Sequence, residues 1–92
     1  MKLLALDTST EACSVAVSVD GVIHERVDHG QHHSDVILGM VQQVLAESGL
    51  SLKQLDAIAF SRGPGSFTSL RIGAGVVQGL AFGANLPVVP VS

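Results

Sequence analysis

The chain has 92 residues, of which 47% are hydrophobic and 14% are charged, a composition typical of one small, apolar globular domain. A chain of this length buries only about 60 to 65% of the surface that its unfolded state exposes, so we expect modest stability unless another chain or domain covers part of it. The net charge of -3 is the wrong sign for a domain that binds nucleic-acid backbones unaided. The single cysteine, Cys13, excludes an internal disulfide and a cysteine-only metal cage.

The sequence contains no signal for a membrane. No stretch approaches the roughly 18 consecutive apolar residues that a membrane span needs. The first apolar run meets Asp7 too early to be the core of a signal peptide. We therefore expect a cytoplasmic protein.

The first part of the chain predicts three antiparallel strands. Residues 3–6 form an apolar run that ends in a polar turn, which indicates a buried strand. Residues 13–19 alternate between apolar and small or polar side chains, the pattern of a strand with one covered face. Asp20 and Gly21 form a favoured two-residue hairpin turn, and residues 22–27 return as the third strand.

The remainder alternates between helices and strands. Ser34 can cap a helix that runs to about residue 48, with Gly49 as its stop signal, and residues 55–60 predict a short strand. A second helix, capped by Ser66 or Thr68, reaches about residue 83, and residues 88–91 form a fifth strand. Because strands joined through helices favour parallel pairing, the order β-β-β-α-β-α-β predicts an α/β fold with a mixed sheet.

Both predicted helices carry apolar residues over roughly half of their circumference, more than one sheet contact requires. Gly75, Gly79 and Gly83 recur at four-residue spacing, which permits a close approach. Tight packing on the domain's own sheet is the first interpretation, and a helix-on-helix interface is the alternative. The candidate interface residues are Val36, Met40, Val44, Ile72, Val76, Gly79 and Gly83.

Two polar segments are candidate phosphate sites. Asp7, Thr8, Ser9 and Thr10 follow the first strand, where backbone amides and hydroxyls could face a phosphate and the carboxylate could hold hydrated magnesium. Taken alone, this segment is better explained as a polar turn that satisfies its own backbone.

The second segment precedes a helix N-terminus, where free N–H groups favour an anion. Its candidate residues are Gly63, Gly65 and Ser66. The segment lacks the spacing of a phosphate loop or of a nucleophile elbow. All four histidines precede Ser66, so a Ser/His pair is open only across the fold.

The histidines do not predict a metal site. His29 and His33 have a spacing suited to a shared metal only on a helix, and Gly30 and the cap at Ser34 argue against one there. We expect solvated loop histidines, and we assign no catalytic or metal-binding residue.

Two segments resemble the signature blocks of a known family. Residues 4–16, LALDTSTEACSVA, and residues 63–73, GPGSFTSLRIG, are similar to the two blocks of the TsaB (YeaZ) family, although Ser69 stands where the family more often has Gly. The resemblance implies an actin-like ASKHA (RNase H-like) lobe. Because family members are about twice as long, it also implies that residues 1–92 are the N-terminal lobe of a longer protein and that the C-terminal lobe is absent from this chain.

The resemblance further implies a function. TsaB is a noncatalytic scaffold for making threonylcarbamoyladenosine next to the anticodon of tRNA; it dimerises with and activates TsaD, which carries the metal. TsaE, an ATPase, completes the complex, TsaB forms homodimers without TsaD, and both dimer contacts use the two helices of this lobe. No cofactor is implied beyond weak binding of ATP or ADP with magnesium, and tRNA is reached only through the complex. The older label "glycoprotease" suggests a peptidase, but the residues supply no catalytic set.

Two alternatives from other classes stay open. An actin-like ATPase or phosphotransferase lobe would bind nucleotide through residues 7–10, with Asp7 on the metal. An RNase H-like nuclease would need further carboxylates near the first strand, and Glu11, Asp56 and Glu47 have no convincing register.

Overall fold

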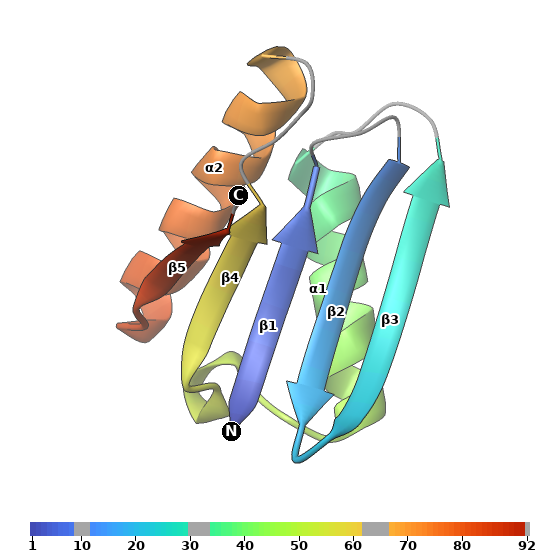
Figure 1. Ribbon diagram of the computed structural model, residues 1–92, viewed down its shortest axis with the longest axis vertical. Coiled ribbons are helices and arrows are strands. Elements are labelled where there is room, and N and C mark those ends of the chain that lie inside the picture. Colours follow the sequence, from blue (N-terminus) through green and yellow to red (C-terminus); the bar gives the residue numbers. More distant parts are fainter. Residues whose placement is uncertain (9–11, 30–33, 62–66, 92) are drawn as a thin grey trace.

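A computed structural model describes residues 1–8, 12–29, 34–61 and 67–91 (Figure 1). Its elements, in chain order, are β1 (Lys2–Asp7), β2 (Ala12–Val19), β3 (Val22–His29), α1 (Ser34–Ser48), a short 3-10 helix η1 (Leu52–Gln54), β4 (Ala57–Ser61), α2 (Phe67–Ala84) and β5 (Val88–Val91). The five strands form one sheet in the order β3-β2-β1-β4-β5. The predicted α/β class and element order are confirmed.

The meander β1-β2-β3 forms as its sequence predicts. Asp20 and Gly21 have φ angles of 50° and 89°, the two positive values that a tight hairpin turn between twisted strands requires. Cys13, Val15 and Val17 of β2 are fully buried, while the residues between them are half-buried. The period-two pattern of β2 therefore identified the covered face correctly.

The strand β3 is longer than expected. Its antiparallel ladder with β2 continues past the predicted end at residue 27, as far as the register pair Ala12 and His29. His29 is consequently a strand residue, and its expected place in a loop is wrong, whereas His24 lies within the predicted third strand.

The strand β4 begins two residues later than expected. The Asp56 carboxylate accepts a hydrogen bond from the Lys2 amide at 2.6 Å, and the Asp56 amide donates to the Lys2 carbonyl at 2.7 Å. Because Asp56 makes these contacts as a turn residue, the parallel ladder between β1 and β4 starts at Leu3 and Ala57.

Both helices end in the same motif. Gly49 and Asn85 have φ angles of 73° and 56°, in the left-handed region. After α1, the Leu50 amide donates to the Leu45 carbonyl at 3.0 Å, and α2 has the equivalent bond at its own end. These bonds satisfy carbonyls that a helix end leaves free, and the Gly49 stop predicted from sequence is confirmed.

The two helices lie on one face of the sheet and contact each other (Figure 1). The core between them and the sheet is apolar, with Leu4, Ile37, Val44, Ile58 and Val77 all 1% exposed or less. In the described ranges, no element covers the opposite face of the sheet.

The uncovered face of the sheet carries exposed apolar side chains on its edge strand β3 and small side chains on the neighbouring strand β2. Ile23 and Val27 of β3 are 65% and 47% exposed, and they lie in register with Ser18 and Ser14 of β2. Since successive side chains of a strand alternate between faces, these residues lie opposite the buried Cys13 and its neighbours.

The buried thiol of Cys13 resists ionisation. Burial raises its pKa from 9.0 to about 11, and the carboxylates of Asp28 and Asp7 add to the shift. A thiol that stays protonated and buried is a weak nucleophile.

We predict that Cys13 makes stability fall as the pH rises from about 9 to about 11. Over this range the unfolded thiol has lost its proton while the folded thiol keeps it, so ionisation favours the unfolded state by up to about 1.4 kcal/mol per pH unit. Urea unfolding from pH 8 to 11 measures the slope. Cys13→Ala should flatten it, and an equal slope in both proteins would contradict this assignment.

Candidate functional site

The end of β1 carries the first candidate site. Asp7 is half-buried and lies in register with Ser14 of β2 and Ser61 of β4. Thr8 follows it and is fully buried, the one buried polar side chain in the part of the chain that the structure describes. Asp7 therefore lies at the carboxyl end of a parallel strand pair, a frequent place for ligands in α/β sheets.

The other residues of the expected phosphate site belong to two segments of the chain. Ser9 and Thr10 of the first segment and Gly63, Gly65 and Ser66 of the second lie outside the described residues. Whether these residues meet Asp7 and Thr8 stays a prediction.

Thr8 packs against the helix α2 at Gly73. A Cβ atom added at Gly73 would overlap Thr8 Oγ1 and would lie 2.7 Å from Cε1 of Phe60. Real Cβ atoms almost never approach other atoms closer than 3.0 Å, so this position requires glycine. The end of β1, the strand β4 and the first half of α2 meet at this one point.

The first interpretation, in which Gly75, Gly79 and Gly83 allow tight packing on the chain's own sheet, is wrong. A Cβ atom at Gly75, Gly79 or Gly83 would meet nothing within 4 Å, so these residues do not provide a close approach to the chain's own sheet. Gly73 does so instead. Its place one helical turn before the buried Val76 and Val77 was the available signal.

The helices α1 and α2 enclose an apolar groove, the second candidate site. It has a volume of about 370 Å³. Its lining residues are Leu38 of α1 and Gly75, Val76, Gly79 and Leu80 of α2. Because the glycines leave the α2 wall open, a further helix can come close to the backbone here.

The structure separates the expected interface residues into two groups. Gly79 and Gly83 are exposed, and Val36 and Ile72 are half-buried. The other three expected residues are buried within the chain: Met40, Val44 and Val76. Val76 also lines the groove. Leu38, Gly75 and Leu80 line the groove but are absent from the expected set.

Next to the groove, α2 exposes an aromatic side chain. Phe82 is 91% exposed and lies one turn beyond Gly79 on a neighbouring stripe of the helix. An exposed phenylalanine beside an apolar groove extends the surface that a partner could cover.

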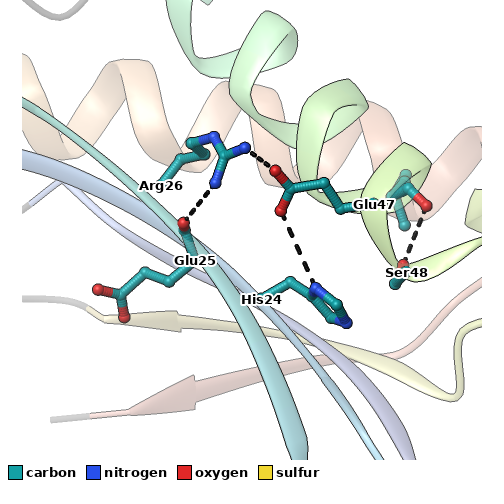
Figure 2. Close-up of polar contacts among 6 residues, drawn as sticks. His24, Glu25, Arg26, Glu47 and Ser48 are labelled. Atoms are coloured by element: carbon teal, nitrogen blue, oxygen red, sulfur yellow. Dashed lines mark hydrogen bonds and ion pairs between the residues drawn. The ribbon is translucent and has the colours of Figure 1, made fainter.

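The edge strand β3 is tied to α1 by charged residues (Figure 2). Arg26 forms an ion pair with Glu47, and His24 Nδ1 lies 3.9 Å from the other carboxylate oxygen. Both the Arg26 and the Glu47 side chains are more than a third exposed, so the pair contributes only about 0 to 1 kcal/mol. We interpret this cluster as a structural tie between sheet and helix.

The described residues also bear on two other possibilities, a metal site and a membrane-spanning helix. Within 1–8, 12–29, 34–61 and 67–91, no three His, Cys, Asp or Glu side chains gather where they could hold a metal ion. None of the described helices is long and apolar enough to cross a membrane.

Comparison with known proteins identifies the family. The family model described as TsaD, tRNA N6-adenosine threonylcarbamoyltransferase, matches residues 8–92. The chain belongs to this family. It is similar to proteins named TsaB and YeaZ, as the sequence blocks indicated.

Three relatives carry this assignment. The chain is 58% identical to the tRNA threonylcarbamoyladenosine biosynthesis protein TsaB of Haemophilus influenzae and 52% identical to that of Escherichia coli, in each case over its whole length. The solved structure of YeaZ from Pseudomonas aeruginosa matches all of the chain with a TM-score of 0.93 and 52% identity. The chain spans 39% and 40% of the two TsaB proteins and 45% of the YeaZ chain.

We predict that alanine has opposite effects at two glycines of α2. Gly73→Ala should lower the free energy of unfolding by about 1 to 3 kcal/mol, because the close contact of α2 with Thr8 and Phe60 must shift. Gly75→Ala should raise it by up to about 1 kcal/mol, because it improves helix propensity in open space. Chemical denaturation of both variants checks this; equal effects would contradict the contact at Gly73.

Proposed function

We propose that this chain acts as a noncatalytic scaffold in the synthesis of threonylcarbamoyladenosine on tRNA, binding and activating a TsaD-type transferase through the apolar groove. The groove between α1 and α2 carries the proposal. In the absence of the transferase, the same groove pairs two copies of the protein. A TsaE-type ATPase joins the complex, and tRNA is contacted through the transferase, in the cytoplasm.

The chemistry of the groove supports a helical protein partner. Its five lining residues are uncharged, and Leu38 is 36% exposed at its rim. Apolar surface of this kind gains free energy by burial against another apolar surface, about 25 cal/mol per Å². A fold relative of this chain would offer a matching helix pair, since the TsaD family model covers residues 8–92 of this sequence.

The net charge supports an indirect role toward tRNA. Eight acidic against five basic residues give no electrostatic attraction for a phosphate backbone. We propose accordingly that residues 1–92 act as one actin-like lobe of a two-lobed protein whose contribution is to hold the transferase in its active form.

Charge insertion in the groove tests the scaffold. Gly79→Arg places a cation in open space without disturbing the core, so the protein should fold while association with the TsaD-type protein falls at least about tenfold. Gln78→Arg is the matched control, because Gln78 is exposed on the same helix but does not line the groove. Analytical ultracentrifugation and a tRNA-modification assay on the mixture give the readouts.

The outcomes separate clearly. Loss of complex and of modification with Gly79→Arg, and neither with Gln78→Arg, would support the scaffold. If Gly79→Arg binds and activates as well as the unchanged protein, the groove is not the partner site.

The position of Asp7 favours a second candidate, an actin-like ATPase or phosphotransferase lobe. A half-buried carboxylate at the carboxyl end of β1 and β4 is suited to holding magnesium and a phosphate group. We expect at most weak nucleotide binding in the scaffold, whereas this alternative requires magnesium-dependent ATP turnover.

Calorimetry and an ATPase assay on the full-length protein distinguish the two. The alternative predicts that Asp7→Asn abolishes magnesium-dependent binding and turnover, because the amide removes the ligand charge while keeping the side-chain size. Weak binding without turnover, together with an active complex, would leave the scaffold as the function.

A further inference from the structure

One contact joins the end of β1 to the helix that forms most of the groove. The Thr8 side chain is fully buried, and its Oγ1 atom occupies the space that a Cβ atom at Gly73 would need. Phe60 of β4 closes the contact from the neighbouring strand, with Cε1 2.7 Å and Cζ 3.1 Å from that added Cβ. The distance of α2 from β1 and β4 is therefore set by the side-chain volume at these positions.

The same part of α2 forms one wall of the groove. Gly75 and Val76, which line it, follow Gly73 within one helical turn. Because an α-helix moves largely as one body, a shift of α2 at Gly73 displaces this wall. The opposite wall is Leu38 of α1, and α1 packs chiefly on β2 and β3. The two walls thus rest mainly on different strands.

We propose that Thr8 and Gly73 are positioning residues that set the width of the apolar groove, and thereby the affinity for its partner, without touching the partner. This inference rests on the proposed function, in which the groove receives a TsaD-type protein. Interiors are close-packed and shift between discrete arrangements, so one added carbon at Gly73 moves the helix instead of being absorbed locally.

A double-mutant cycle in the full-length protein tests the inference. Gly73→Ala should weaken association with the TsaD-type protein about tenfold, and Thr8→Ala combined with it should restore most of the affinity, because the smaller side chain frees the space of Oγ1. The Phe60 ring, whose Cε1 atom would lie 2.7 Å from the added Cβ, must still move in the double variant, so the restoration is incomplete. Restoration by a second truncation is not expected from a simple loss of stability, since Thr8→Ala removes a further buried contact.

Two controls separate position from stability. Val17→Ala removes buried volume beneath α1, away from the Thr8 contact, and should reduce stability while changing affinity less than about twofold. Gly39→Ala makes the same exchange in open space on α1 and should leave affinity unchanged.

If Gly73→Ala does not fold, Thr8 alone keeps the inference testable. Thr8→Ala should then weaken association in a folded protein, and Thr8→Ser, which keeps the hydroxyl, should restore it. Unchanged affinity in the Gly73 and Thr8 variants, or no restoration in the double variant, would overturn the inference. Failure of the unchanged protein to bind would instead overturn the proposed function.

Discussion

The two helices lie on one face of the sheet because of the direction in which its strands are joined. The chain leaves the meander through α1 to β4 and then continues through α2 to β5, stepping outward in one direction from β1. Connections between parallel strands are right-handed, so two successive steps in one direction place both helices on the same side. This constraint makes α1 and α2 neighbours and leaves the other face of the sheet uncovered in the described residues.

The candidate partner site follows from that arrangement. Two helices on one face must either fill the space between them or leave a groove, and here glycines on the outer side of α2 leave it open. The apolar residues on this side of the helix therefore face a gap rather than the core. The wide apolar arcs of the sequence are explained by two contacts, one with the sheet and one along the groove.

Local sequence rules predicted most of the fold. Alternation identified the covered face of β2, and Asp20, Gly21 and Gly49 marked turns whose positive φ angles only a few residue types accept. The limits of β3 and β4 were less accurate, because they depend on pairing with β2 and on the contact of Asp56 with Lys2. Such contacts join residues that no local window contains.

The site was predictable only in part, for the same reason. Helical periodicity showed that α2 has small residues on more than one side, but not which glycine meets the sheet. That choice depends on Thr8 and Phe60, which are distant in sequence from Gly73 and reach it through the parallel pairing of β1 with β4. His29 was misplaced by a similar effect, since pairing with β2 extends the ladder beyond the predicted strand end as far as His29.

The position of β1 also has a consequence for the order of folding. Its pairing with β2 is local and can form as soon as the first hairpin is made, but its pairing with β4 must wait until the α1 segment has been synthesised and has closed a long loop. During that interval one edge of the central strand lacks its partner, and unpaired edges favour association between chains. The meander with α1 is thus the natural first unit of folding, and the groove can exist only after the last helix has joined it.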